Sequence, residues 1–511
     1  MKINIGHWVA KWASLKPEKP AIIFENKAFS YKFLNERVNR AAHMFQQMNI
    51  TRNDRVGVLM HNTYQLVEIF FALAKIGAIF VPLNTRLSSA ELNYIVNDSR
   101  TKALIFDEKF IGTLEPCIKD FPVGEECFLC LGKPPEWAKS YENEITFQKI
   151  DEPEEKGPAG GEDPLSILYT SGTTGVPKGA VLSHRKTFFN SLNANIYYGL
   201  RSSDIMLAPR PMFHSGGVFV ELCPIIYAGG TLIMQKRFDP EEILFTIEKY
   251  KATVLEIPAT TLRFILEQCD LSKHDLSSLR VCYTGGEQVS PELLDSYFNA
   301  GIVVSQIYGQ TETSTLTWLA PEDAIRKRGS IGKPVFHGNV MIIDKNGQET
   351  KPEEIGEIAA SGCILMNGYW GNPELTEDTI IDGLLHTGDL AKRDEEGFFF
   401  IVGRKKDVYI SGGENVYPAE VERVLLENQK ILNVGVCGIP HDKWGETGLA
   451  CIVLKTGEHM TEEEIVDFCE GRLARYKIPN IIEFVKALPI NAAQKIDRKK
   501  LKNDYMLNRI E

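Results

Sequence analysis

Short apolar runs alternate with stretches of helical periodicity in the first 106 residues. Apolar residues recur at helical spacing between residues 66 and 76, and Ser88 with Glu91 has the pattern of a capping box that opens a second helix. Strands are predicted at 55–60, 78–81 and 103–106. Because strands and helices alternate, this region predicts a parallel sheet.

The alternation resumes after a polar connector, residues 151–163, which is rich in glycine and proline. Further strands are predicted at 165–169, 231–234, 253–257, 280–283 and 303–307. From about residue 329 to 402 the runs become short and β-rich with glycine turns, which predicts a small β-subdomain. Beyond it, helix and strand patterns mix again.

These patterns predict an α/β fold built from two unequal domains. We expect a large N-terminal domain, residues 1–402, made of two stacked α/β subdomains plus the small β-subdomain. A charged hinge at residues 403–407 then leads to a smaller, mobile α+β C-terminal domain at 408–511. The length of 511 residues agrees with more than one hydrophobic core.

Composition and charge narrow the class of protein. Hydrophobic residues make up 43% of the chain and charged residues 24%, as in an ordinary globular protein. Fifty-seven basic against 68 acidic residues give a formal charge of −11, so no bulk positive field attracts nucleic acid or an anionic membrane. A nucleotide is still compatible, because backbone amides and a few local cations can bind phosphate.

Cysteine usage and the apolar stretches predict a cytoplasmic location. Ten cysteines are scattered, mostly in apolar runs, as is typical of reduced, buried thiols. Cys127 and Cys130 have C-x-x-C spacing without a second pair, which disfavours a redox or metal role. The amino terminus lacks the apolar core of a signal peptide, and the most apolar stretch, 66–83, contains Glu68 and Lys75. No integral membrane segment is therefore expected.

Residues 170–179, Thr-Ser-Gly-Thr-Thr-Gly-Val-Pro-Lys-Gly, follow a predicted strand and suit a phosphate group. Glycines let backbone amides turn toward an anion, hydroxyls donate hydrogen bonds, and the lysine supplies charge. The loop is not a Walker A loop, because Pro177 stands where that pattern needs glycine. A glycine- and threonine-rich surface turn is the alternative. The candidate phosphate-binding residues are Thr170, Ser171, Gly172, Thr173, Thr174, Gly175 and Lys178.

Residues 169–180 resemble the phosphate-binding signature of the adenylate-forming superfamily, which includes acyl-CoA synthetases, luciferases and nonribosomal-peptide adenylation domains. Further motifs appear in the family's order, so the resemblance covers essentially the whole chain. It implies that ATP with Mg²⁺ activates a carboxylic acid as its acyl-adenylate. CoA then attacks the adenylate to give acyl-CoA and AMP.

The motif Tyr308-Gly-Gln-Thr-Glu-Thr resembles the family segment that binds the nucleotide and metal. The resemblance implies that Tyr308 stacks on adenine with Gly309 beside it, that Thr311 contacts the α-phosphate, and that Glu312 binds Mg²⁺. A hard carboxylate oxygen suits Mg²⁺. Without the family, Glu312 would be interpreted as a solvated charge. Gln306, in the preceding strand, is a further nucleotide-binding candidate.

Other motifs resemble the family's adenine and ribose contacts. Gly285, Gly286 and Glu287 follow the strand 280–283 and match the adenine-side loop. Asp389, in His-Thr-Gly-Asp, matches the aspartate that accepts hydrogen bonds from both ribose hydroxyls, a task that suits two carboxylate oxygens. Arg404 matches the companion contact to ribose or phosphate. Both residues would otherwise be ordinary surface charges.

Two further residues resemble the family's catalytic groups. His214, in Pro-Met-Phe-His, matches the histidine that lines the acyl pocket, although a lone histidine is often only structural. Lys495 matches the lysine that bridges the substrate carboxylate and the α-phosphate, where a cation stabilises developing charge. The chain departs from the usual pattern with Gln494 where glycine generally precedes this lysine, and with Ile490 where a basic residue is common.

Ser411, Gly412 and Gly413 resemble the loop that moves beside the pantetheine tunnel in CoA ligases, where a glycine lets the thiol chain pass. Lys406 matches the hinge about which the small domain rotates, presenting Lys495 for the first step and Gly412 for the second. We expect an AMP-forming acyl-CoA ligase. The alternatives are a luciferase-like oxygenase, an enzyme that loads a carrier protein, and an inactive nucleotide-sensing scaffold.

The acid itself cannot be identified from the sequence. The acyl pocket is expected around residues near His214, and no acidic or basic anchor is evident, which favours an uncharged, hydrophobic tail. A medium- or long-chain fatty acid and an aryl acid both stay open. A homodimer is the usual prior for such an enzyme. The remaining expected pocket residues are Val218, Thr284, Gly309 and Trp318.

Overall fold

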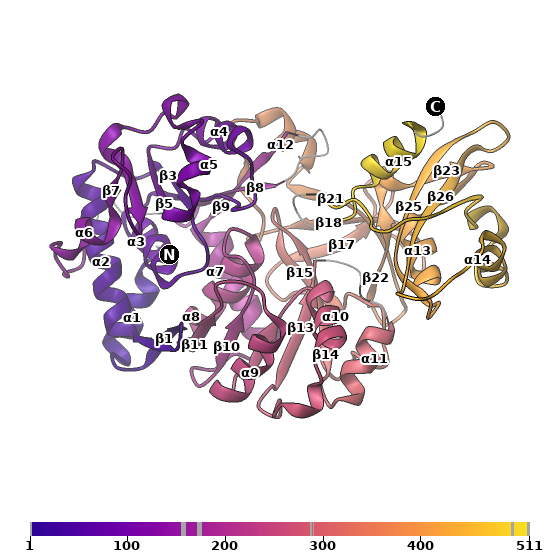
Figure 1. Ribbon diagram of the computed structural model, residues 1–511, viewed down its shortest axis with the longest axis horizontal. Helices are drawn as coiled ribbons and strands as arrows, with labels where there is room; N and C mark the ends of the chain where they lie inside the picture. Colours follow the sequence, from indigo (N-terminus) through magenta and orange to yellow (C-terminus); the bar gives the residue numbers. More distant parts are fainter. Residues whose placement is uncertain are drawn as a thin grey trace.

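The computed structural model describes residues 3–154, 160–170, 176–286, 289, 291–491 and 495–507. Within them the chain forms four sheets that follow one another along the molecule (Figure 1). Two large sheets lie in the N-terminal part, a five-stranded sheet follows, and the C-terminal part has a five-stranded sheet of its own. The predicted α/β fold class is confirmed.

The first sheet has eight strands in the order β19-β9-β8-β4-β3-β5-β6-β7. Strands β3, β4, β5 and β8 are mutually parallel where they pair, as the strand and helix alternation predicted. The predicted capping box of Ser88 and Glu91 is present at the start of α4. The strands are β3 (Arg55–Leu59), β4 (Ile79–Pro82), β5 (Ala103–Asp107), β6 (Phe128–Leu131), β7 (Lys139–Ser140), β8 (Pro164–Thr170), β9 (Lys178–Ser183) and β19 (Gly368–Tyr369).

The second sheet has nine strands in the order β16-β15-β14-β13-β12-β10-β11-β1-β2, with a parallel centre and antiparallel edges. Strands β1 and β2 come from the beginning of the chain, whereas the rest of this sheet comes from residues after 200. The N-terminal segment therefore links the two large sheets. The strands are β1 (Pro20–Phe24), β2 (Lys27–Ser30), β10 (Ile205–Ala208), β11 (Thr231–Met234), β12 (Val254–Glu256), β13 (Val281–Gly285), β14 (Val304–Gln310), β15 (Ser314–Trp318) and β16 (Lys333–Pro334).

The two sheets share one core. Val56 of β3 and Val254 of β12 belong to the same buried cluster, and the helices between the sheets fill it. Alternate residues of the same strands face outer helices, as Leu104 and Leu255 do. Strands buried on both faces therefore have nearly continuous apolar runs. The inner helices are α1 (His7–Leu15), α2 (Tyr31–Gln47), α3 (Tyr64–Ile76), α7 (His184–Tyr197) and α8 (Cys223–Ala228), and the outer ones are α4 (Ser89–Asp98), α5 (Ile111–Leu114), α9 (Pro240–Tyr250), α10 (Ala259–Gln268) and α11 (Pro291–Asn299). Helix α6 (Tyr141–Thr146) packs on α2.

The small β-subdomain lies between the two large sheets and the C-terminal part (Figure 1). It begins at β17, later than predicted, because β16 pairs with β15 and extends the second sheet. Its strands are β17 (Asn339–Ile343), β18 (Gly356–Ser361), β20 (Ile380–Ile381), β21 (Leu384–Arg393) and β22 (Phe399–Arg404), with α12 (Pro373–Thr379) beside it.

The C-terminal part has a separate sheet covered by helices, with its own buried cluster. The pairs in this sheet are antiparallel except that β27 runs parallel to β26. Between it and β22 lies one 3₁₀ turn, Lys405–Asp407, so the predicted hinge overlaps the end of β22. Its elements are β23 (Tyr409–Ser411), β24 (Glu414–Val416), α13 (Pro418–Leu426), β25 (Ile431–His441), β26 (Gly445–Leu454), α14 (Glu462–Cys469), β27 (Ile481–Phe484) and α15 (Arg498–Leu507).

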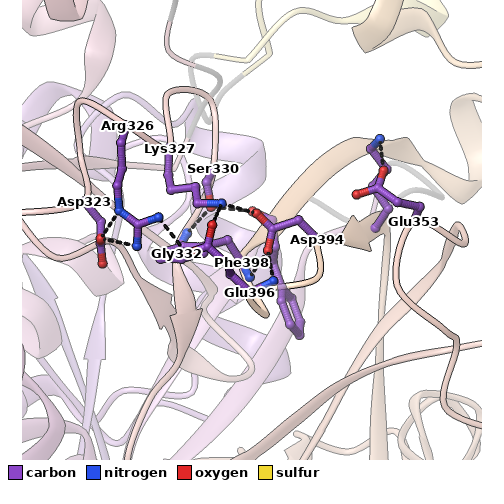
Figure 2. Close-up of polar contacts among 11 residues, drawn as sticks. Asp323, Arg326, Lys327, Ser330, Gly332, Glu353, Asp394, Glu396 and Phe398 are labelled. Carbon is purple, nitrogen blue, oxygen red and sulfur yellow. Dashed lines mark hydrogen bonds and ion pairs between the residues drawn. The ribbon is translucent and has the colours of Figure 1, made fainter.

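A charged network fastens the β21–β22 hairpin to the loop that follows β15 (Figure 2). Lys327 pairs with Asp394 at 2.6 Å and with Glu396 at 2.5 Å, and Arg326 pairs with Glu396 at 2.6 Å. Both cations lie over the ring of Phe398, which is buried. Cation–π contact and apolar burial thus act on one ring. The network holds the hairpin that carries Asp389 against the second sheet.

Replacing Phe398 with alanine should lower the stability of the N-terminal part. Phe398 is 1% exposed, and removing a buried phenylalanine side chain costs about 3–5 kcal/mol. The midpoint of thermal unfolding should therefore fall by several degrees. Phe336→Ala is the matched control, because Phe336 is 77% exposed. Equal midpoints for the two variants would contradict the anchoring role of the ring.

Candidate active site

The predicted phosphate loop connects β8 to β9, which run antiparallel. Thr170 ends β8 and pairs directly with Lys178, the first residue of β9. The two ends of the loop are therefore held together by the sheet. The loop positions Ser171, Gly172, Thr173, Thr174 and Gly175 lie outside the described residues.

Lys178 lies beside the predicted metal ligand. Its ammonium group is 5.6 Å from the ring centre of Tyr369, and the hydroxyl of Tyr369 donates a 2.9 Å hydrogen bond to Oε1 of Glu312. A cavity of about 170 Å³ opens here, and Lys178, Tyr369, Trp370 and Asp98 are among its lining residues. The phosphate-loop lysine and Glu312 thus belong to one site, although more than 130 residues separate them in the sequence.

Glu312 lies in the turn between β14 and β15 and fits Mg²⁺ by its chemistry. No group of three or more His, Cys, Asp or Glu side chains capable of holding a metal occurs among the residues that the structure describes. A protein-only cage is therefore not present in that part of the chain. One carboxylate, with the remaining ligands from phosphate and water, is the arrangement that Mg²⁺ commonly takes in nucleotide sites.

A buried lysine that the sequence reasoning missed lies behind this turn. Lys186 of α7 is 1% exposed and donates a hydrogen bond to Oγ of Ser314. Burial lowers the pKa of Lys186 to about 7, although the negative charge of Glu312 acts in the opposite direction. Through this hydrogen bond, Lys186 supports the turn that carries Glu312 from inside the protein. Nothing in the motif Ser-His-Arg-Lys distinguishes it in sequence from an exposed helix lysine.

Asp389 is the most highly hydrogen-bonded of the predicted nucleotide ligands. Its Oδ2 accepts from the hydroxyl of Tyr308 at 2.8 Å and from Nε2 of Gln310 at 2.7 Å. Its Oδ1 accepts from Nε of Arg404 at 2.7 Å, and the two residues are direct cross-strand partners on β21 and β22. Burial and the charge of Asp389 raise the pKa of Tyr308 well above its ordinary value. The structure therefore brings Tyr308, Asp389 and Arg404 together, with Gln310 as an unforeseen fourth member.

Close backbone approach explains several glycines of the predicted site. At Gly285, a Cβ atom would lie 2.5 Å from the carbonyl oxygen of Ile307, and at Gly309 it would lie 1.9 Å from that of Ser314. Gly286 has a positive φ of 91°. Side chains are excluded at these positions. Glu287 lies outside the described residues.

Gln306 is turned toward the protein interior. It is 5% exposed, and its Nε2 donates a 3.0 Å hydrogen bond to the carbonyl oxygen of Ser330. Its backbone carbonyl also accepts from Leu319 at 2.8 Å. We propose that Gln306 supports the strand that carries Tyr308 rather than donating its amide to the nucleotide.

The structure brings the segments of His214 and Thr311, two predicted site residues, into contact. The hydroxyl of Thr311 donates to Oγ of Ser215 at 3.4 Å, next to His214. Burial lowers the pKa of His214 to about 4, and the positive charges of Arg210, Arg86 and Lys495 lower it further. His214 is therefore a neutral imidazole at physiological pH, suited to line a pocket for an uncharged group.

Lys495 is exposed and belongs to the C-terminal part, yet its charge acts on His214. Its backbone amide donates to Oδ1 of Asn491 at 3.1 Å, and Gln494 lies outside the described residues. Ser411 is buried, while Gly412 and Gly413, with φ of 61° and 90°, form the turn between β23 and β24. Lys495 therefore lies close enough to His214 for its charge to act on that imidazole.

Sequence reasoning also missed a buried polar group next to His214. Arg210 donates a 2.5 Å hydrogen bond to Glu256, and its Nε lies 3.7 Å from Oε1 of Glu221. Glu221 and Glu256 are 0% and 1% exposed. In the sequence, each glutamate is the sole charged residue of an apolar run, at 218–222 and at 254–257. A charge in such a run is the sequence feature that could have indicated a buried polar group. The structure thus places charged residues close to His214, although no such anchor was evident in the sequence.

The other sequence expectations concern cysteines and membrane segments. All ten cysteines are free thiols, and burial raises the pKa of Cys130 to about 11, which makes a reactive pair with Cys127 unfavourable. Among the helices of the described residues, none has the length and apolar character needed to cross a bilayer.

Comparisons with known proteins match nearly the whole chain. A family model described as AMP-binding enzyme matches residues 9–370, and one described as AMP-binding enzyme C-terminal domain matches residues 420–495. A 2-succinylbenzoate–CoA ligase of Bacillus thuringiensis subsp. konkukian is 35% identical over 98% of this chain and 99% of its own length. An indoleacetate–CoA ligase of Aromatoleum aromaticum is 33% identical over 97% of this chain and 96% of its own.

A solved structure is similar to this chain over nearly its full length. The O-succinylbenzoate coenzyme A synthetase of Bacillus subtilis, in complex with ATP and a magnesium ion, matches with a TM-score of 0.86 and 30% identity. The match covers 97% of this chain and 99% of that one. Both parts of the present chain are therefore included in the comparison.

The buried neutral state of His214 predicts a pH dependence of stability. Because its folded pKa of about 4 lies below the unfolded value of 6.5, the unfolded chain takes up a proton first as the pH falls. The contribution of neutral His214 to the free energy of unfolding is thus complete above pH 6.5. It decreases between pH 6.5 and 4, by about 3 kcal/mol at most.

Urea unfolding at pH 7 and pH 4.5 measures this effect. The wild-type protein should lose more stability between the two pH values than His214→Asn loses. His459→Asn, a substitution of an exposed histidine, is the control and should behave as the wild type does. The same pH dependence in His214→Asn and wild type would show that His214 is not held neutral by burial.

Proposed function

The chain belongs to the AMP-binding enzyme family and is an acyl- or aryl-CoA ligase that works through an acyl-adenylate; on that premise we propose that its acid is an aryl acid. The observation that supports an aryl acid best is a buried aromatic cluster, here called the aromatic wall, that includes the predicted pocket residue Trp318 and the neighbour of Thr284. Tyr197 lies 6.0 Å from Tyr283 and 6.1 Å from Trp318 between ring centres. Such rings pack favourably against a flat aromatic group.

The relatives support the same choice over a fatty acid. The two ligases compared above act, by their names, on a succinylbenzoate and an indoleacetate, both of which carry an aromatic ring. A medium- or long-chain fatty acid, which the sequence left open, would need a long apolar tunnel. In the described part of the chain, Glu221 and Glu256 instead place polar groups near the aromatic wall.

The site residues divide the first half-reaction among them. In our proposal, Asp389 and Arg404 hold the ribose, the glycines of the adenine-side loop admit the base, and Thr170 with Lys178 flank the loop around the leaving pyrophosphate. Mg²⁺ held by Glu312 would supply charge neutralisation on the phosphates. Lys495 offsets the repulsion between the acid's carboxylate and the α-phosphate as the C–O–P anhydride bond forms.

The second half-reaction uses the same acyl pocket. We propose that the C-terminal domain, 408–511, rotates about the hinge 403–407 and replaces Lys495 by the turn at Gly412. Gly412 carries a positive φ of 61°, and a Cβ atom there would approach the ring of Trp444 to 3.2 Å. The thiol of CoA attacks the acyl carbonyl and AMP leaves. A homodimer remains part of the proposal without a specific contact to support it.

A panel of acids tests the function directly. Aryl acids of the benzoate, phenylacetate and indoleacetate types should release pyrophosphate with ATP, and adding CoA should produce AMP and an aryl-CoA thioester. Decanoate and palmitate should be at least about tenfold poorer in kcat/KM, which is the effect of about 1.4 kcal/mol of transition-state binding. A preference for the fatty acids would overturn the aryl assignment.

The same assay separates the alternative functions. Transfer to a phosphopantetheine carrier protein but not to free CoA would indicate a loading enzyme. Light emission or oxygen uptake would indicate a luciferase-like oxygenase. No AMP with any acid would indicate a nucleotide-binding scaffold.

Replacing Lys495 with alanine should separate the two half-reactions. Acid-dependent exchange between ATP and pyrophosphate should fall by about 10²-fold or more, because the cation at the developing charge is lost. Thioester formation from supplied acyl-adenylate and CoA should be retained. Lys499→Ala, four residues further along the same basic segment and exposed, is the matched control. Unchanged exchange in Lys495→Ala would remove Lys495 from the mechanism.

A further inference from the structure

Arg210, Glu221 and Glu256 form a buried polar cluster behind the predicted acyl site. Arg210 follows β10, Glu256 ends β12, and Glu221 lies in the π-helical segment Gly216–Leu222. Both glutamates are shielded from solvent, and the guanidinium of Arg210 is 17% exposed. The proposed two-step reaction as described above uses none of the three.

The cluster borders the residues that surround the acyl group. Nη2 of Arg210 donates to the carbonyl oxygen of Gly285 at 3.4 Å, at the start of the adenine-side loop. A Cβ atom on Gly216, two residues after His214, would lie 3.0 Å from Cδ of Arg210. The positive charge of Arg210 also acts on His214. Arg210 therefore lies between two segments of the proposed acyl pocket.

One cation faces two carboxyl groups in this cluster. Arg210 bonds Glu256 at 2.5 Å but reaches Glu221 only at 3.7 Å, which is beyond hydrogen-bond distance. Neither side-chain oxygen of Glu221 has a hydrogen-bond partner among the residues that the structure describes. Burial and the neighbouring charge of Glu256 raise the pKa of Glu221 well above its ordinary value. The shift favours the protonated form of Glu221, and a protonated carboxyl group offers one hydrogen-bond donor and one acceptor.

A second buried polar atom in the same region also has no protein partner. The hydroxyl of Thr284, on β13 next to Gly285, is 0% exposed and makes no hydrogen bond to any described residue. Buried polar groups are nearly always satisfied, so two such groups, one in the segment that follows His214 and one at the predicted pocket residue Thr284, indicate a missing bonding partner. A polar substituent on the acyl group would supply one.

We propose that Glu221, positioned by Arg210 and Glu256 and assisted by Thr284, is a specificity-determining residue that binds a hydroxyl or amino substituent on the aryl acid. This inference rests on the proposed function and names the substrate class more narrowly. A hydroxyl group can donate to the Glu221 carbonyl oxygen and accept from its O–H. An acid lacking the substituent leaves both atoms of Glu221 unbonded, which is how a site built for hydrogen bonding rejects the plain analogue.

The same cluster discriminates against a second carboxylate on the acid. Arg210 already bonds Glu256, so a further anion would meet a cation that is largely neutralised. We therefore expect this chain to accept a different acid from the 2-succinylbenzoate ligases, whose named acid has two carboxyl groups. An uncharged substituent avoids the cost of burying a second negative charge without a cation to pair with it.

The test measures kcat/KM by pyrophosphate release for benzoate, phenylacetate and indoleacetate, each unsubstituted or with one hydroxyl, amino or carboxylate group at each ring position. In the wild type, the best hydroxyl or amino derivative should exceed its parent acid by about tenfold or more. The carboxylate derivatives and 2-succinylbenzoate should fall below the parent. Glu221→Leu should bring the ratio of substituted to parent acid to about one.

Three controls separate recognition from folding. Thr284→Val removes the second polar atom at similar volume and should also reduce the ratio of kcat/KM between the substituted and the parent acid. This variant keeps the test decisive if Glu221→Leu does not fold. Glu267→Leu replaces an exposed glutamate of α10 and should keep the wild-type ratio. Thermal unfolding of every variant shows whether a change in the ratio accompanies a loss of structure.

The outcomes distinguish this inference from the proposed function. Wild-type preference for hydroxyl or amino acids that disappears in Glu221→Leu supports the inference. A wild-type ratio that survives in folded Glu221→Leu and Thr284→Val overturns it, as does a preference for 2-succinylbenzoate, while the aryl-acid function would stand in both cases. No pyrophosphate release with any acid of the panel would overturn both proposals.

Discussion

The carboxylate of Asp389 is the contact on which the arrangement of the site depends. It receives hydrogen bonds from Tyr308 and Gln310 on β14 and from Arg404 on β22, so one side chain joins the second large sheet to the β-subdomain. Charge-assisted hydrogen bonds to a buried carboxylate are among the stronger polar contacts in proteins. The network around Phe398 acts on the same hairpin from its other end. Because Arg404 is also the last residue before the 3₁₀ turn Lys405–Asp407, any rotation there begins at a residue that Asp389 holds.

Much of the fold could be predicted because its physical causes are local. Continuous apolar runs marked β3, β4, β5 and β11 through β13, since strands buried on both faces need no polar side. The capping box of α4 gave its first residue correctly. Pairing across long separations was not predictable in this way. Strand β1 joins the second sheet beside β11, and β19 joins the first sheet beside β9, although each lies far along the chain from that partner.

Site residues could be predicted where a motif places several of them on one loop. They were harder to predict where single residues from distant parts of the sequence come together in the fold. Asp389 and Arg404 came from motifs, and the structure adds that they are cross-strand partners. Tyr369, Lys186 and Glu221 belong to no motif, and their importance follows from burial and from what they face. A lysine on a helix or a glutamate in an apolar run becomes informative once its neighbours are known. Burial makes a polar group dependent on its partners, and sequence spacing does not reveal those partners.

The pairing of Thr170 with Lys178 has a consequence for how the phosphate loop can change. Successive residues of a strand point to opposite faces, so Lys178 shares a face with Ala180, while Gly179 lies over Tyr169 and the outer helices. A slip of β9 by one residue against β8 would turn the ammonium group of Lys178 away from Tyr369 and toward the outer layer. Side chains within the loop can vary without moving its ends, but a shift of strand register would remove the cation from the site altogether. The sheet register is thus as much a determinant of anion binding as the loop's own chemistry.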